Sequence, residues 1–202
     1  QLSSTTLEDI DPDLASQVRH TSEGRHILHE VLDYQLQHAG IVHDTVTHVH
    51  AGRRLIEFIP NAHPSANSAR RNMRLCSKAR TEILQSENFD AALQLAVDAV
   101  RQITGFARTK IYRFQTDWSG KTVAESNDGS LPSYLGLHFP ERDIPQQVRH
   151  LMTIVPYRGI ASTSSDTCRV CATDQEDQEL DLTWSVLRSV SPMHLQYLSN
   201  MG

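Results

Sequence analysis

Hydrophobic positions along the chain recur at two spacings, and these spacings predict alternating helical and extended segments. Apolar residues three and four apart predict helices, and together with helix-starting signals they lead us to expect helices at residues 23–36, 66–85, 86–104, 145–152 and 192–201. Alternation of apolar and polar residues predicts half-buried strands, which we expect at residues 45–50, 54–59, 108–114 and 121–126. Short connections within each strand pair predict two hairpins. The mixture of helices and antiparallel strand pairs predicts an α/β (α+β) fold class.

The helix at 86–104 has the clearest boundaries. Ser86 or Asn88 can cap its start, and Gly105 can end it in a left-handed conformation. The helix before it, 66–85, is rich in arginine and has few large apolar residues, so we expect a surface or connecting helix. Helix, strand, turn and strand in that order are typical of the opening of a three-layer α/β domain.

A rigid turn is predicted around Asp143. Pro140 and Pro145 stand five residues apart and fix an extended path, and Pro145 can also begin the following helix. Asp143 therefore lies at a helix entrance. Two interpretations remain open: the carboxylate only caps the helix, or the turn presents it, with main-chain carbonyls, to a cationic or N–H-rich ligand.

The segment that ends the chain combines an arginine with a well-punctuated helix. Ser191 can cap this helix and Pro192 suits its first turn. One helical face carries His194, Tyr197, Leu198 and Met201, and Arg188 precedes the helix. This face either belongs to the core or holds a large apolar ligand with carboxylates. Arg158, on an extended segment, could join Arg188 in clamping two carboxylates, since planar guanidinium groups bind carboxylates well.

The histidines and cysteines do not form a complete metal site. His48 and His50 share one strand face, but we identify no third ligand and expect a solvated face. Cys168 and Cys171 form a single CxxC pair in a polar, acidic stretch, 161–179, that we expect to be a long loop. We therefore predict no metal or redox site and no catalytic residue.

Composition narrows the class of protein. The 202 residues are 39% hydrophobic and 21% charged with a net charge of −5, which suits one large or two small soluble domains and argues against nucleic acid or anionic membranes as partners. No apolar run reaches the ~18 residues of a membrane helix. Three cysteines are too few for a disulfide scaffold, so we expect a cytoplasmic protein. The chain lacks an initiator methionine and stops after a helix-ending signal, so we expect a fragment.

Several motifs resemble, in the same order, those of the chromophore-binding GAF domain of phytochromes, most closely bacteriophytochromes. These are Tyr112-Arg113-Phe114, Asp117-Trp118-Ser119-Gly120, Leu131-Pro132-Ser133-Tyr134-Leu135-Gly136-Leu137-His138-Phe139-Pro140, Asp143-Ile144-Pro145 and the run from Arg188 to Gly202. The resemblance implies a GAF domain at residues 86–202, with a central antiparallel sheet flanked by helices. It also implies a partial PAS-like domain at 1–62 and a connecting helix at 63–85.

The resemblance implies a red/far-red photoreceptor module that binds a linear tetrapyrrole and signals through its photoisomerisation. Asp143, with its main-chain carbonyl, would hold the pyrrole nitrogens, and His194 would stack beside them. Arg158 and Arg188 would bind the propionates, helped by Ser191. The other pocket residues would be Tyr112 and Tyr197 beside the rotating ring, with Phe139, Ile144, Pro145 and Met193.

The chain also departs from the family. Met193 stands where plant and cyanobacterial phytochromes carry the cysteine that attaches their bilin, and bacteriophytochromes use a cysteine upstream of the PAS domain. Biliverdin is therefore the expected cofactor, with an attachment cysteine that this chain does not identify. Met152 replaces a frequent tyrosine near the propionates. The loop with Cys168 and Cys171 is not the usual aliphatic, proline-rich loop of the family's knot.

The resemblance implies partners as well as a pigment: a homodimer, and in a full-length protein a PHY domain and an output domain, commonly a histidine kinase. The module itself would be a sensor, not an enzyme. The alternative is a pigment-free GAF module that dimerises or binds another small ligand. A metal- or thiol-dependent enzyme is a third class, for which the ligand set is incomplete.

Overall fold

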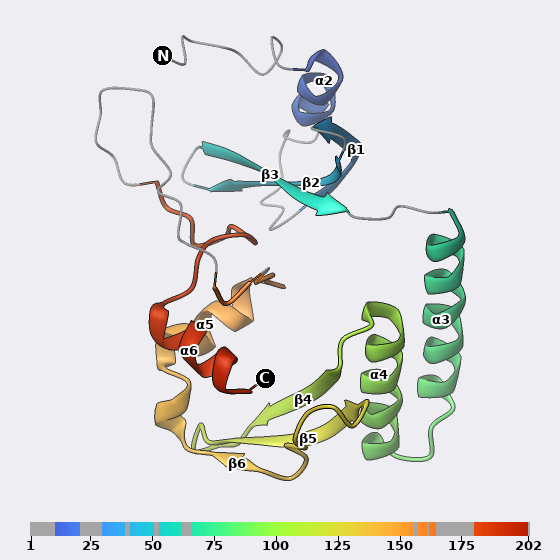
Figure 1. The fold of residues 1–202 in the computed structure, drawn as a ribbon, viewed down its shortest axis with the longest axis vertical. Coiled ribbons are helices and arrows are strands. Elements are labelled where there is room, and N and C mark those ends of the chain that lie inside the picture. Colours follow the sequence, from blue (N-terminus) through green and yellow to red (C-terminus); the bar gives the residue numbers. More distant parts are fainter. Residues whose placement is uncertain are drawn as a thin grey trace. The chain divides into compact units, whose positions relative to one another are not determined.

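The computed structural model describes residues 11–20, 30–38, 41–50, 53–61, 66–155, 157–160, 162–164 and 180–201. The chain forms two compact units. One unit consists of residues 64–149, and the other combines residues 1–63 with residues 150–202. Figure 1 shows the elements of both units. The predicted loop at 161–179 lies largely outside the described residues, as do Cys168, Cys171 and Gly202.

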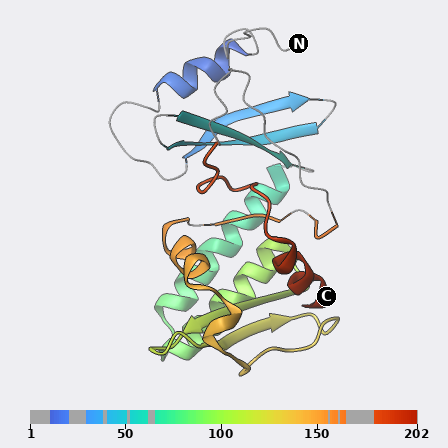
Figure 2. The same cartoon turned by 90° about the vertical axis from the view of Figure 1, so that its left-hand side faces the viewer.

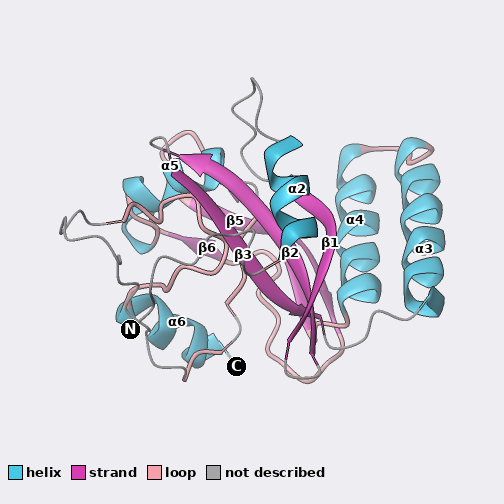
Figure 3. Cartoon of the chain, turned by 90° about the horizontal axis from the view of Figure 1, so that it is seen from above, coloured by secondary structure: helices cyan, strands magenta, loops and turns pink. Residues whose placement is uncertain are grey.

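The first unit in sequence contains a three-stranded antiparallel sheet. Its strands are β1 (Glu30–His38), β2 (Ile41–His50) and β3 (Arg53–Asn61), in the order β1-β2-β3. Helix α2 (Pro12–His20) packs against β1, as Figure 3 shows from above. The pairing of β2 with β3 confirms the first predicted hairpin and extends both strands beyond their predicted ends.

The helix predicted at 23–36 is wrong over its described part. Residues 30–38 form β1, which pairs with β2 on both sides of a register shift between Leu32 and Gln35. The apolar spacing there fits a helix, but hydrogen bonding to a neighbouring strand decides the backbone of a short segment that lies at a sheet edge. Residues 21–29 lie outside the described part of the chain.

The unit formed by residues 64–149 has three layers. Helices α3 (Ala66–Leu84) and α4 (Phe89–Thr104) lie side by side, and α4 covers the antiparallel sheet β4-β5-β6 (Figures 1 and 2). The strands are β4 (Arg108–Phe114), β5 (Gly120–Asn127) and β6 (His138–Phe139). Alternate residues of β5, from Gly120 to Ser126, are buried. The predicted helices, hairpin and α+β class are confirmed.

The ends of α4 follow the sequence signals closely. The Asn88 side chain accepts a hydrogen bond from the Ala91 amide at 2.9 Å, and Gly105, with φ of 73°, donates to the Arg101 carbonyl at 2.8 Å. An N-cap amide and a left-handed glycine satisfy polar groups that a helix leaves unpaired at its two ends. These contacts fix where β4 begins.

The remaining elements are short helices. The 3₁₀ turn η1 (Glu141–Asp143) precedes α5 (Gln146–Ile154), and α6 (Pro192–Met201) follows an irregular segment, 180–191. Among the described residues, no helix combines the length and the apolar character that a membrane crossing requires.

Candidate functional site

The residues predicted to bind a ligand divide into two groups, one in each unit. Tyr112, Phe139, Asp143, Ile144 and Pro145 lie in the unit of residues 64–149. Arg158, Arg188, Ser191, Met193, His194 and Tyr197 belong to the other unit. Each group has its own internal geometry.

Aromatic rings gather on the β4-β5-β6 sheet. The rings of Tyr112 and Phe139 lie 5.7 Å apart, and Phe139 is 6.2 Å from Tyr134. Tyr112 lies against the backbone of Gly120, where a Cβ atom would overlap the tyrosine ring. The sequence places Tyr112 on this face of the strand, but Gly120 was not recognised as the residue that makes room for its ring.

A lysine borders these rings. The Nζ atom of Lys110 lies 4.4 Å from the ring centre of Tyr134 and 5.9 Å from that of Phe139. Burial lowers the pKa of Lys110, the positive charge of Arg108 lowers it further, and Glu125 acts in the opposite direction. The aromatic group therefore carries a cation at one side, held by attraction to the ring faces.

The turn that carries Asp143 is held by an arginine. Arg149 is only 7% exposed, and its guanidinium donates to the Ile144 carbonyl at 2.7 Å and the Glu141 carbonyl at 3.3 Å. It also forms an ion pair with the Glu141 carboxylate at 2.8 Å. Because these bonds join α5 to η1, Arg149 fixes the backbone on both sides of Asp143.

Asp143 itself is exposed, and its amide donates to the Pro140 carbonyl at 3.1 Å. Within the described part of the chain, its carboxylate accepts no hydrogen bond, so it does not cap α5. The Pro145 carbonyl accepts from the amides of Val148 and Arg149, which confirms that Pro145 opens the helix. As far as the described residues show, the turn therefore presents the Asp143 carboxylate with its hydrogen-bonding capacity unused.

Arg149 was missed by the sequence analysis. Its signal was present as an arginine four residues after the helix-opening Pro145 and eight residues after Glu141. That spacing places the side chain over the turn that precedes its own helix, since helical side chains point toward the helix N-terminus. The residue serves the site by positioning the turn.

In the other group, the side chain of Arg158 contacts the backbone of Arg188. The Nη2 atom of Arg158 donates to the carbonyls of Arg188 at 2.6 Å and Ser189 at 2.7 Å. The Nε atoms of both arginines are buried and have no hydrogen-bond partner among the described residues. Burial lowers the pKa of Arg158, and the positive charge of Arg188 lowers it further. One nitrogen of Arg158, Nη2, therefore binds backbone carbonyls. The two guanidinium groups together form a cationic site that has no acidic partner among the described residues.

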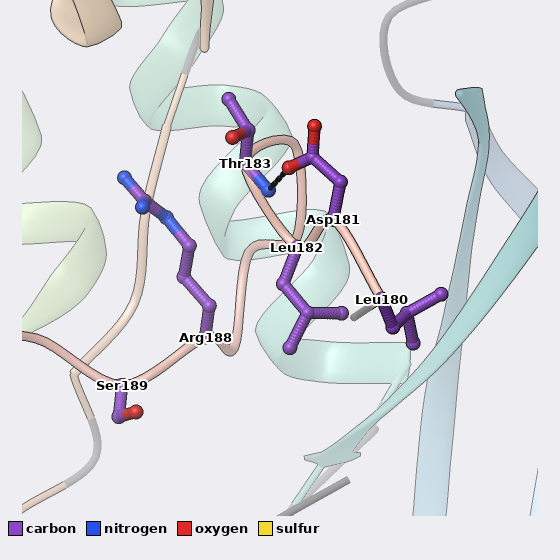
Figure 4. A pocket seen from close by; sticks show the side chains of 6 residues that line it. All are labelled: Leu180, Asp181, Leu182, Thr183, Arg188 and Ser189. Atoms are coloured by element: carbon purple, nitrogen blue, oxygen red, sulfur yellow. Dashed lines mark hydrogen bonds between the residues drawn. The ribbon is translucent and has the colours of Figure 1, made fainter. Parts of the chain in front are cut away.

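Arg188 and Ser189 border a hollow of about 460 Å³. Figure 4 shows its other lining residues, which belong to the turn at 180–183. The Asp181 carboxylate accepts a hydrogen bond from the Thr183 amide at 2.9 Å and is also hydrogen-bonded to the ring of His50. The hydrogen bonds with Thr183 and then with His50 lower the pKa of Asp181 to about 2, so this turn keeps a negative charge.

Helix α6 begins as predicted. The Ser191 hydroxyl accepts from the His194 amide at 3.3 Å, and the Ser191 carbonyl accepts from His194 and Leu195. No residue described in α6 is fully buried, and Met193 and Tyr197 are exposed to 83% and 42%. Of the two interpretations of this face, the described residues therefore do not support the one that places it in the core. Burial, and then the positive charge of Arg158, lower the pKa of His194, which favours the neutral form of its ring.

The strand histidines do not share a solvated face as expected. His48 is 2% exposed, and its Nδ1 atom lies 3.7 Å from the Glu57 carboxylate, whereas the His50 Nε2 atom lies 2.9 Å from Asp181. Among the described residues, no three side chains of the metal-binding types lie together in a group that could hold a metal ion.

No family model matches the chain, but its sequence is similar to several known proteins of one kind. The chain is 36% identical over 161 residues to cyanobacterial phytochrome B of Nostoc sp., and the matched region covers 79% of this chain and 21% of that protein. It is 44% identical over 122 residues to a bacteriophytochrome of Pseudomonas aeruginosa, and the matched region covers 59% of this chain and 17% of that protein. The chain thus spans about a fifth of the length of these curated relatives.

Solved structures agree with these relatives. The photosensory core module of Stigmatella aurantiaca phytochrome matches with a TM-score of 0.82 and 33% identity, over 95% of this chain and 39% of that one. The chromophore-binding domain of an unusual bacteriophytochrome from R. palustris matches with a TM-score of 0.77 and 31% identity, over 95% of this chain and 63% of that one.

Proposed function

Because the chain belongs to the phytochrome family, we propose that it forms part of the pigment-binding region of a red/far-red photoreceptor and holds the linear tetrapyrrole biliverdin. Bound biliverdin would absorb red light and isomerise at a double bond. The protein's task is to hold the pigment, set its protonation and transmit the change.

The observation that carries this proposal is the arginine pair. Arg158 donates to the Arg188 carbonyl at 2.6 Å, and the charge of Arg188 lowers the pKa of Arg158. Each arginine has a buried Nε–H group without a partner among the described residues. Buried donors of this kind are costly unless a partner completes them. A carboxylate supplies both the missing acceptor and the missing negative charge, and biliverdin carries two propionates.

The other residues have chemistry that suits the same ligand. The Asp143 carboxylate and backbone, fixed by Arg149, can accept hydrogen bonds from pyrrole N–H groups. His194, whose lowered pKa favours the neutral ring, can stack beside the pyrroles and exchange a proton with their surroundings. Ser191 would assist at the propionates.

Apolar and aromatic residues would complete the pocket. We assign Tyr112 and Tyr197 to the ring that rotates. Phe139, Ile144, Pro145 and Met193 supply the remaining contacts. A thioether at position 193 cannot attach the pigment covalently, so any attachment would use another residue.

The domain arrangement belongs to the same proposal. We assign residues 1–62 to a partial PAS-like domain, 63–85 to a connecting helix and 86–202 to a GAF domain. The full-length protein would be a cytoplasmic homodimer with PHY and output domains, and the module described here would sense light without catalysing a reaction.

An absorption spectrum of the full-length protein mixed with biliverdin tests the proposal. We expect a strong red band that shifts after red illumination and returns under far-red light. Denaturation in acid would then show whether the pigment is covalently held. A folded protein that produces no such band would favour the pigment-free GAF module instead.

A further inference from the structure

A buried carboxylate on β3 holds the chain just before Arg188. Glu57 is 8% exposed, and its Oε2 atom accepts from the Ser185 hydroxyl at 2.5 Å and from the Leu187 amide at 2.8 Å. Its Oε1 atom accepts from the Val186 amide at 3.0 Å. One side chain therefore binds three consecutive residues that are about 130 positions away in the sequence.

The hydrogen bonds of Glu57 hold a segment that has no regular secondary structure. Residues 185–191 belong to no helix or strand, so regular hydrogen bonding does not determine their path. Ser185 and Val186 are nevertheless buried, at 6% and 1% exposure. Buried amides require acceptors, and the Glu57 carboxylate accepts from the buried Val186 amide and from the partly buried Leu187 amide.

Arg188 is thus held from both sides. Glu57 binds the amide of Leu187, directly before it, and Arg158 binds the carbonyls of Arg188 and Ser189. A charged side chain that must bind a ligand does so more tightly when its backbone is already fixed, because less freedom is lost on binding.

We propose that Glu57 is a positioning residue for carboxylate recognition by Arg188. It acts through the backbone of residues 185–187 and touches no ligand itself. This role rests on the proposed binding of a carboxylate-bearing pigment, and it adds to the site a residue from the β1-β2-β3 sheet that the sequence analysis had not considered.

The test compares Glu57→Gln with the unmodified full-length protein, using biliverdin and its dimethyl ester as probes. The glutamine keeps one acceptor but not the three charged bonds. We expect about tenfold weaker binding of biliverdin, the equivalent of one charge-assisted hydrogen bond, and little change for the ester, which lacks carboxylates. In an Arg188→Met background, Glu57→Gln should have no further effect on biliverdin.

Asp128→Asn is the matched control. Asp128 also binds a serine hydroxyl and a backbone amide, those of Ser130, but it lies on a loop outside the proposed site. We expect this variant to bind both probes normally. If Glu57→Gln weakens both probes equally, or adds to Arg188→Met, Glu57 acts through general stability and the inference is wrong.

A measurement without pigment separates this inference from the proposed function. In the pigment-free protein, NMR should show faster amide exchange at Val186 and Leu187 and a shifted Arg188 Nε–H signal in Glu57→Gln. If the unmodified protein binds no biliverdin, the proposed function is wrong. Independently of that result, an Arg188 Nε–H signal that is unchanged in Glu57→Gln would overturn the positioning role. Ser185→Ala removes only one bond, so it provides the same comparison if Glu57→Gln does not fold.

Discussion

Two arginines of this protein, Arg149 and Arg158, both hold backbone carbonyls, but only one has its interactions completed. Arg149 binds two carbonyls and the Glu141 carboxylate, so its charge is balanced within the protein. Arg158 also binds two carbonyls, yet the charge that acts on its pKa is that of another arginine, Arg188. Its Nε–H group is buried without a partner in the described part of the chain.

The difference separates a structural arginine from one suited to a ligand. A buried ion pair with further hydrogen bonds fixes a turn, because removing either partner leaves an uncompensated group. Two neighbouring cations with unused donors are unfavourable until an anion binds them. Arg149 therefore stabilises the fold, whereas Arg158 and Arg188 have the properties that the proposed carboxylate binding requires.

The largest effect is expected from Arg149→Met. The substitution removes the ion pair with Glu141 and leaves the Ile144 carbonyl without its donor, so we expect the free energy of unfolding to fall by about 2–4 kcal/mol. Urea unfolding followed by tryptophan fluorescence would measure it. A loss below about 0.5 kcal/mol, the range of ordinary surface substitutions, would show that Arg149 is not structural.

A smaller effect, and on binding instead of stability, is expected from Arg158→Met. Biliverdin affinity should fall about tenfold through the loss of a charge-assisted bond, while stability changes by less than about 1 kcal/mol because repulsion from Arg188 is also removed. Fluorescence titration and urea unfolding on the same protein would measure both. A large loss of stability with unchanged affinity would reverse the comparison.

The smallest effect concerns His194. Its pKa is lowered by burial and then by Arg158, so the unfolded chain binds this proton more readily than the folded one. The contribution of this histidine to stability is therefore present above pH 6.5 and decreases as the pH falls below that value. NMR titration of the pigment-free protein should show a higher pKa in Arg158→Met, and an identical titration curve would place Arg158 too far away to act on the ring.

The sequence predicted those elements whose signals are local. Asn88 and Gly105 determine the ends of α4 through contacts within a few residues, and Ser191 does the same for α6. The helix expected at 23–36 failed because pairing with β2, a distant segment, decides the backbone of residues 30–38.

Long-range contacts also explain why Glu57 was missed. Glu57 binds residues about 130 positions away. No periodicity or spacing indicates a contact of that separation. Arg149 is different, because its bonds to Glu141 and Ile144 are local and its spacing from Pro145 could have indicated them. The residues proposed to bind the ligand lie in motifs that the sequence displays, whereas no motif indicates the contact of Glu57 with residues 185–187.

The close packing of Tyr112 on Gly120 restricts how this protein can vary. Any side chain at position 120 would displace the tyrosine ring, and a smaller residue at position 112 would leave a void above the glycine. The two positions can therefore change only together. Among homologous sequences, we expect a residue larger than glycine at position 120 to occur only where position 112 no longer carries a ring in this orientation.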